Sequence, residues 1–321
     1  MKKHVSLLMA LMLLLSLFSA AGRAEMPLRI VCTTFPQYDW TRCILGDRAN
    51  DVELVLLLDN GIDLHNYQPT ADDIIKIARS DLFVYVGGES DKWVSDVLQA
   101  AQNPNRRVIS MLETVVAKEE ETVEGMQAEV HAHDEDEAHD HEAEYDEHVW
   151  LSLRNAEAII RVLADALCEL DPAHAELYRA TASAYIDQLA ALDARYSDMV
   201  HSASRTTILF ADRFPFRYLA DDYGLTYYAA FVGCSAETEA SFETIAFLAK
   251  KVDELKLPVV LTIEGDNHSI AETVVSSTQA KNQQILVINS LQSVTANDIA
   301  DGESYLGIMT ENLDVLKEAL S

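Results

Sequence analysis

Four side chains of the metal-ligand type follow predicted strands or close a loop: His65, His148, Asp212 and Glu264. Neutral imidazole and carboxylate groups both bind divalent cations. In open α/β sheets, ligands bind at the carboxyl ends of the strands, so side chains at these positions can converge. Two of the four come from each half of the chain. The pattern predicts a divalent-metal site between two lobes.

Each of these residues also has an ordinary structural interpretation. A lone His65 in a loop is usually a surface or turn residue, and Asp212 could cap a helix that begins after it. Glu264 precedes a turn-like sequence, and His148 could simply pack beside Trp150. Their coincidence at matching strand ends, in a chain that also carries a His-rich segment, favours the metal site.

An acidic, His-rich segment occupies residues 118–147 and contains few apolar residues. Because it cannot bury a core of its own, we expect it to be disordered. His-rich tracts are typical of metal binding, although a solvated acidic loop with incidental histidines is the alternative. The segment has two His-x-His pairs, which we predict to be weak, secondary metal ligands: His131, His133, His139 and His141.

The amino terminus indicates export. Residues 1–24 have a basic start, an apolar run over Val5–Phe18 and small residues up to Ala24, which is the layout of a cleaved secretory signal peptide. The apolar run is short for a membrane span, so we expect a periplasmic protein. The formal net charge of −29 argues against nucleic-acid partners and anionic membrane surfaces. We expect a monomer.

The chain has four cysteines and no Cys-x-x-Cys motif. In an oxidising compartment they could form one or two disulfides, and the pairing stays open. Buried, unpaired thiols explain them equally well. No role in metal binding is predicted for any of them: Cys32, Cys43, Cys168 and Cys234.

Short apolar strands alternate with amphipathic helices in two stretches, residues 25–172 and 205–321. In the second stretch the predicted strands include Thr206–Phe210 and Leu225–Phe231, and a helix is predicted near Arg213–Tyr223. Continuous apolar strands indicate parallel sheets covered on both faces. Residues 173–204 between the two stretches contain a predicted helix from His174 to about Ser202, which would be about 40 Å long. We therefore predict an α/β fold of two pseudo-symmetric lobes with parallel sheets, joined by a long interlobe helix. The alternative is a helical hairpin with the predicted helix Asn155–Leu170, inside one lobe.

Several segments resemble one family. Asp63–Thr70 (Asp-Leu-His-Asn-Tyr-Gln-Pro-Thr) and Asp146–Leu151 (Asp-Glu-His-Val-Trp-Leu) are similar to the first two ligand segments of the periplasmic zinc and manganese receptors of ABC importers. Asp171-Pro172 with the following helix resembles their interlobe helix, and Phe210–Phe214 their third ligand segment. The resemblance implies an extracytoplasmic receptor, not an enzyme, that captures zinc and delivers it to the membrane permease of an ABC importer.

Two departures from the family pattern affect the expected ligand shell. The third histidine of the family falls at about Ala211, which makes Asp212 the nearest replacement. A late aspartate of some members falls near Asn289, which could leave its role to Glu264. Two histidines with two carboxylates resemble the manganese receptors, whereas a His-rich loop is typical of the zinc receptors. We expect Zn²⁺, with Mn²⁺ as the alternative.

A secreted metal-dependent hydrolase is the alternative of another class. His141-Glu142 begins like a His-Glu-x-x-His motif, but Tyr145 stands where the second histidine should be. The chain has neither a Gly-x-Ser-x-Gly elbow nor a glycine-rich phosphate loop. These observations disfavour an enzyme. A third class is a metal buffer or adhesin without an importer partner. The residues do not distinguish it from a receptor, because both would bind metal.

Overall fold

The computed structural model describes residues 27–127, 144–235, 239–265 and 267–321. The predicted signal peptide, residues 1–24, and the four predicted weak ligands His131, His133, His139 and His141 lie outside the described residues. Within the described ranges, no helix is both long enough and apolar enough to cross a membrane.

The amino-terminal lobe is built on a four-stranded parallel sheet of order β2-β1-β3-β4. Its strands are short and mostly apolar, because helices cover the sheet and leave little of it to solvent. The strands are β1 (Arg29–Cys32), β2 (Glu53–Leu56), β3 (Leu82–Tyr85) and β4 (Arg107–Ser110). The helices of this part of the chain are α2 (Phe35–Leu45), α3 (Ala71–Arg79), α4 (Trp93–Ala100), α5 (Met111–Thr114) and α6 (Leu153–Leu170).

The carboxy-terminal lobe repeats this plan with a parallel sheet of order β6-β5-β7-β8. In both sheets the second strand of the lobe lies at one edge and the first lies beside it. The predicted fold class, two α/β lobes of similar plan, is confirmed. The strands are β5 (Thr207–Phe214), β6 (Thr226–Val232), β7 (Val259–Ile263) and β8 (Gln284–Ile288). The helices are α8 (Arg217–Tyr223), α9 (Phe242–Leu255), α10 (Ser269–Ser277), α11 (Ala296–Ala300) and α12 (Tyr305–Ala319).

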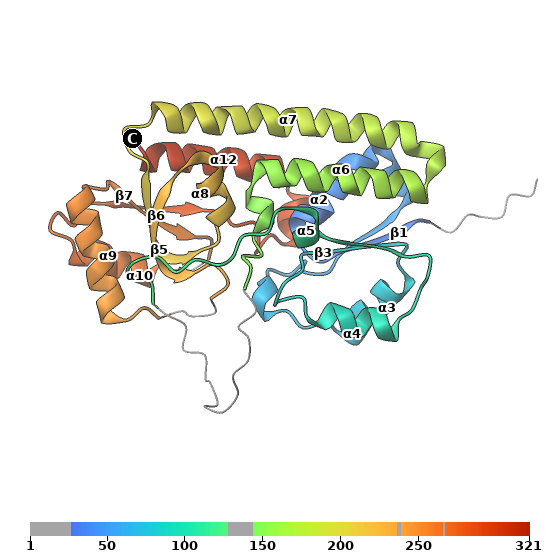
Figure 1. Ribbon diagram of the computed structural model, residues 1–321, viewed down its shortest axis with the longest axis horizontal. Helices are drawn as coiled ribbons and strands as arrows, with labels where there is room; N and C mark the ends of the chain where they lie inside the picture. The colour runs from blue at the N-terminus through green and yellow to red at the C-terminus, as the bar shows by residue number, and fades with distance from the viewer. Residues whose placement is uncertain (1–26, 128–143, 236–238, 266) are drawn as a thin grey trace, which may run out of the picture.

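Helix α7 (Ala175–Ser202) joins the lobes and runs along both of them (Figure 1). Its 28 residues give it a length of about 42 Å at 1.5 Å per residue. It packs on α6 at one end and on α12 at the other, where the Tyr196 hydroxyl donates to the Met309 carbonyl at 2.6 Å. The predicted interlobe helix and the hairpin with α6 are therefore both present.

A buried cluster of aromatic residues ties the lobes together below α7. The indole nitrogen of Trp150 donates to the Ser290 carbonyl at 2.9 Å, and the Tyr305 hydroxyl donates to the Trp150 carbonyl at 2.6 Å. The backbone N–H of Tyr305 donates to Asp39 at 2.9 Å, and its ring packs edge-on against Trp40. Because all of these groups are buried, separating the lobes here would leave their polar atoms unpaired.

Strand β5 is longer than predicted. The expected strand ended at Phe210 with a helix from about Arg213, but β5 continues to Phe214 and α8 begins at Arg217. The pairing of β5 with β6 shifts register between Phe210 and Arg213, which is the mark of a bulge. Pro215, which cannot donate to the ladder, follows the strand end. Asp212 therefore lies within the strand at the bulge, not beyond its end.

Residues 118–127 form a strap across the carboxy-terminal lobe, so the predicted disorder of residues 118–147 is wrong for this part and for residues 144–147. The strap begins where the Lys118 N–H donates to the Tyr218 hydroxyl at 3.0 Å. It ends where the Gln127 N–H donates to the Ala230 carbonyl at 2.9 Å. Figure 1 shows it passing from α5 towards β5 and α9. Its few apolar residues, such as Val123, are enough to pack on the core.

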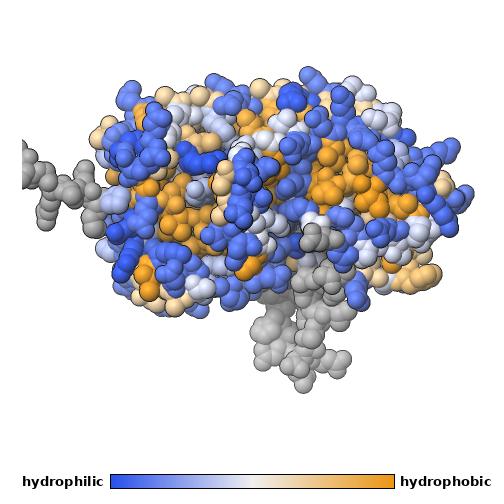
Figure 2. All heavy atoms as spheres, turned by 180° about the vertical axis from the view of Figure 1, so that it is seen from behind, coloured by the Kyte–Doolittle hydropathy of each residue, from blue (hydrophilic) through white to orange (hydrophobic). Residues whose placement is uncertain are grey.

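Hydrophilic residues cover much of the face seen in Figure 2, and apolar residues show in an area on each lobe. Charged residues make up 24% of the chain, and side chains of this kind lie mostly on the surface.

Candidate metal centre

His65 lies just after β2, in the short 3₁₀ helix η2 (Leu64–Asn66). The Asp63 carboxylate caps this turn by accepting from the His65 N–H at 3.0 Å, and Leu64 is buried beneath it. The His65 side chain is only 7% exposed. The cap and the buried leucine therefore fix His65 at the carboxyl end of the amino-terminal sheet.

His148 precedes another 3₁₀ turn, η3 (Val149–Leu151), which leads into α6. The residue is fully buried, at 0% exposed. The Asp146 carboxylate holds it twice, accepting from its backbone N–H at 2.8 Å and lying 2.9 Å from its ring Nδ1. This arrangement leaves the other ring nitrogen of His148 free to face His65.

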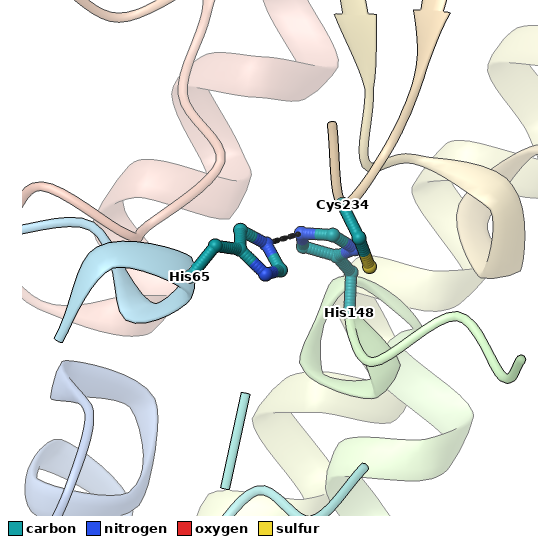
Figure 3. A group of neighbouring side chains, drawn as sticks. All are labelled: His65, His148 and Cys234. Carbon is teal, nitrogen blue, oxygen red and sulfur yellow. Dashed lines mark hydrogen bonds between the residues drawn. The ribbon is translucent and has the colours of Figure 1, made fainter. Parts of the chain in front are cut away.

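The two imidazoles meet through their Nε2 atoms, which lie 3.3 Å apart (Figure 3). A tetrahedral zinc ion bonds imidazole nitrogens at about 2.0–2.1 Å, which separates two such nitrogens by roughly 3.3 Å. The spacing of His65 and His148 is therefore the spacing that a shared zinc ion requires.

The outer ring nitrogens explain why the Nε2 atoms face each other. Nδ1 of His65 lies 2.8 Å from the Ser90 hydroxyl, and Nδ1 of His148 lies against Asp146. When each Nδ1 carries its proton and donates it outward, each Nε2 presents a lone pair to the other ring. Metal-binding histidines typically have their second nitrogen engaged in this way, because it fixes the tautomer and the ring orientation.

The two histidines differ in proton affinity. Burial, and next the neighbouring His148, lower the pKa of His65 to about 3. Burial also acts to lower the pKa of His148, but the Asp146 carboxylate outweighs it and the pKa is raised. Of the two histidines, His148 therefore holds a proton more tightly, and a divalent ion would have to displace any proton that it carries.

Cys234 brings a third donor to this centre. In the described part of the chain, the one group of three metal-type donors whose atoms all lie within 4.8 Å of one another is His65, His148 and Cys234. Figure 3 shows the Cys234 sulfur beside the His148 ring. No such role was predicted for Cys234 from the sequence. It follows the predicted strand Leu225–Phe231, so the strand-end rule that selected Asp212 and Glu264 applies to it as well.

Glu147 lies beside the histidine pair and is 1% exposed. One carboxylate oxygen accepts from the Ser90 N–H at 2.8 Å. The other lies 3.7 Å from Nδ1 of His65 and has no hydrogen-bond partner among the described residues. Burial raises the pKa of Glu147 to about 7. A pocket of about 270 Å³ opens here, lined by His65, Glu89, Ser90, Glu120, Glu144, Tyr145, Glu147 and Cys234.

The structure does not bring Asp212 and Glu264 to the histidine pair. They line a neighbouring pocket of about 350 Å³ between the lobes. Asp212 accepts from the Thr262 hydroxyl at 2.6 Å. Glu264 accepts from the Ser290 N–H at 2.7 Å and from its hydroxyl at 2.6 Å. Each carboxylate is thus satisfied within its own lobe, and neither lies in the pocket that His65 lines.

Arg213 and Asp63 form an ion pair across this second pocket. Burial acts to raise the pKa of Asp63, but the Arg213 guanidinium outweighs it and the pKa is lowered. Because Asp63 also caps the turn that carries His65, the ion pair links the carboxy-terminal lobe to the position of this histidine.

All four cysteines are free thiols. Cys32 packs against the Thr41 hydroxyl, and the Cys168 thiol donates to the Ala175 carbonyl at 3.5 Å. The structure therefore contains neither of the two disulfides that the sequence allowed. Burial raises the pKa of Cys234 well above its usual range, so this thiol keeps its proton unless a cation displaces it.

The chain matches the family model of zinc-uptake complex component A, periplasmic (ZnuA), over residues 30–319. It is 31% identical over 319 residues to the zinc-binding lipoprotein AdcA of Streptococcus pneumoniae serotype 4, which covers 98% of this chain and 61% of AdcA. It is 29% identical over 293 residues to the high-affinity zinc uptake system protein ZnuA of Bacillus subtilis, covering 91% and 88% of the two chains. The chain thus spans less than two thirds of the length of AdcA.

Solved structures show the same architecture. The Zn(II)-bound ZnuA-like domain of Streptococcus pneumoniae AdcA aligns with a TM-score of 0.72 at 29% identity, over 92% of this chain and 99% of that one. The metal-dependent lipoprotein YcdH of Bacillus subtilis gives 0.73 at 26% identity, over 91% and 99%. The periplasmic zinc binding protein TroA of Treponema pallidum gives 0.70 at 25% identity, over 92% and 99%.

Proposed function

Because this chain belongs to the periplasmic zinc-uptake component A family, we propose that it is an extracytoplasmic receptor that captures zinc and delivers it to the permease of an ABC importer. The relatives named for zinc binding and zinc uptake support zinc as the cargo. The predicted signal peptide supports the location outside the cytoplasm. We propose that the receptor acts as a monomer, with the ion held where its two lobes meet.

The observation that carries this proposal is the facing pair of Nε2 atoms, 3.3 Å apart, on the buried His148 and on His65, whose side chain is 7% exposed. Imidazole ligands suit zinc better than manganese, which favours carboxylate, carbonyl and water oxygens. The two carboxylates that would have favoured manganese, Asp212 and Glu264, are hydrogen-bonded elsewhere. The centre that His65 and His148 form is therefore a zinc site in preference to a manganese site.

Burial of the pair also favours a receptor over a secreted hydrolase. A hydrolytic metal keeps an open position at which substrate and water meet. His148 is 0% exposed and the His65 side chain is 7% exposed, so a bare ion fits this centre better than a polymer chain does. We propose no catalytic activity for this protein.

Zinc titration by calorimetry tests the function. The mature protein should bind one equivalent tightly, and His65→Ala and His148→Ala should each abolish that binding. His201→Ala is the matched control, because His201 is exposed near the end of α7. At a free zinc level of about 100 times Kd, binding should stabilise the fold by about 2.7 kcal/mol. Tight binding that survives His148→Ala would refute this centre.

The predicted ligands Asp212 and Glu264 are tested by their alanine variants. A four-ligand shell of two histidines and two carboxylates predicts weaker zinc binding or altered selectivity in both. The hydrogen bonds that hold these carboxylates predict a smaller effect, because each would have to leave its partners to reach an ion. A large loss of zinc affinity in Glu264→Ala would show that the lobes rearrange to place it in the shell.

The His-rich segment is proposed to gather zinc loosely at the entrance of the centre. Glu144 and Tyr145, near the end of this segment, line the same pocket as His65. High local ligand concentration near a tight site favours capture. Deleting residues 128–143 retains the strap and Asp146, and should leave one tight zinc equivalent while removing the weaker ones. Loss of the tight equivalent would instead place the primary site in the deleted residues.

A further inference from the structure

Both histidines of the proposed centre belong to the amino-terminal lobe. His65 follows β2, and His148 precedes α6. The carboxylates expected from the other lobe do not lie with them, so the pair alone leaves two positions of a tetrahedral zinc ion open. Among the described residues, the metal-type donor from the carboxy-terminal lobe that groups with the two histidines is Cys234, which follows β6.

The chain is shaped to bring Cys234 to this position. The preceding residue, Gly233, runs against the His148 ring. A Cβ at Gly233 would lie 3.2 Å from Nδ1 of His148 and 2.9 Å from the Phe214 carbonyl. Only glycine leaves room for this close approach. The Cys234 N–H is in turn held by the Glu120 carboxylate of the strap at 3.0 Å.

A second observation at the same place points to a cation. The free oxygen of Glu147 has no hydrogen-bond partner among the described residues, although the residue is 1% exposed and lines the pocket that His65 and Cys234 share. A buried carboxylate oxygen without a donor is costly unless a cation or water satisfies it. An anionic wall beside two imidazoles and a thiol is the environment that a divalent ion stabilises.

We infer that Cys234 supplies a thiolate ligand from the carboxy-terminal lobe, so that the cargo site is a His₂Cys centre selective for thiophilic divalent ions. This inference rests on the proposed zinc-receptor function. As sulfur bonds the ion, the thiol loses its proton to solvent. Tetrahedral zinc with sulfur at about 2.3 Å places sulfur roughly 3.6 Å from a ligand nitrogen. From within 4.8 Å, a movement of about 1 Å suffices.

Thiolate ligation also changes which metal ions the receptor prefers. Soft thiolates select zinc over the oxygen-seeking ions manganese and magnesium. In this site the Cys234 thiolate would thus take the place that a third imidazole or a carboxylate takes in other metal sites, and it would set the preference for zinc. The ion would also bridge the lobes, because Cys234 comes from the carboxy-terminal lobe and both histidines come from the amino-terminal lobe.

Cobalt(II) spectroscopy on the mature, full-length protein tests this inference. Bound to thiolate, cobalt gives a charge-transfer band in the near ultraviolet, which imidazole and carboxylate ligands do not give. The wild type and Cys43→Ser should show the band, and Cys234→Ser should lose it. Cys43 is the matched control because it is a partly buried free thiol outside the centre. Serine is close in size to cysteine, so the fold should hold.

Zinc and manganese competition supplies the second readout. Because removal of a residue that merely orients a ligand costs about 10–100-fold in metal affinity, loss of a direct ligand should cost at least about tenfold for zinc. Manganese affinity should change less, so selectivity should fall in Cys234→Ser.

The outcomes separate the two proposals. One tight zinc equivalent without the cobalt band in the wild type, or a band that persists in Cys234→Ser, overturns the thiolate ligand and leaves the receptor function standing. No tight zinc equivalent in the wild type overturns the receptor function itself.

Discussion

Asp146→Asn is a direct test of how the centre holds its metal. The carboxylate of Asp146 accepts from the backbone N–H of His148 and lies against its Nδ1, at 2.8 and 2.9 Å. Asparagine keeps the size and can keep the backbone hydrogen bond through its carbonyl oxygen. What it loses is the negative charge that holds the ring tautomer and makes Nε2 of His148 a stronger donor to zinc.

The expected magnitude follows from this geometry. Partners of this kind are worth about 10–100-fold in metal affinity, or about 1.4–2.7 kcal/mol. The upper half of that range applies here, because His148 is 0% exposed and the Asp146 side chain is 4% exposed, so water screens neither. One effect opposes the loss. The Asp146 carboxylate also raises the pKa of His148, so in the variant protons compete less strongly with zinc for the His148 ring. The loss should therefore be largest at pH 8 and smaller near pH 6.

Calorimetric zinc titration at both pH values measures this. The control is Asp165→Asn, because Asp165 is an aspartate exposed on α6, outside the group of metal-type donors. It should bind zinc like the wild type. Wild-type affinity in Asp146→Asn at pH 8 would show that His148 does not bind the ion through Nε2, and the facing-pair arrangement would then be wrong.

Three further predictions concern the site and its frame. Zinc affinity should fall about tenfold more per pH unit below the raised pKa of His148 than above it, because the imidazole proton must then leave in addition to the proton of the Cys234 thiol, and a calorimetric profile that does not steepen between pH 8 and 5.5 would contradict this. Gly88→Ala should lower the free energy of unfolding in urea by roughly 2 kcal/mol or more, because φ is +82° and the new Cβ would lie 2.8 Å from Cγ of Glu147. Gly302→Ala, with φ +104° and open space, isolates the backbone part of that cost, and an equal loss in both would exclude the contact. Trp150→Phe should lower thermal stability by about 1–3 kcal/mol, because it leaves a buried carbonyl of the other lobe without its donor, and an unchanged melting curve would show that water replaces it.

The sequence predicted the architecture because its signals are local. Apolar runs and helix periodicity located the strands of both lobes and the helix that became α7. The strand-end rule also placed His65 correctly at the carboxyl end of the amino-terminal sheet. It failed for Asp212, because a bulge within β5 changed where the strand ended and which partners the carboxylate met.

These local signals do not predict contacts between distant parts of the chain. The hydrogen bond from Trp150 to Ser290 joins residues 140 positions apart, and no local pattern encodes it. Cys234 was missed for a different reason. Its position after a strand was readable, but only the fold shows that Gly233 brings the adjoining backbone against the ring of His148.

The complete burial of His148 has a consequence for the lifetime of the bound ion. An ion that bridges the lobes leaves only during moments when they part, so its escape rate is the product of the open fraction and the escape rate from the open form. Each 1.4 kcal/mol of opening free energy lengthens the dwell time about tenfold. A docking partner that favoured the open form would therefore hasten discharge without touching any ligand. Capture strength and delivery speed could then be adjusted separately, the first at the histidines and the second at the buried contacts of Trp150 and Tyr305.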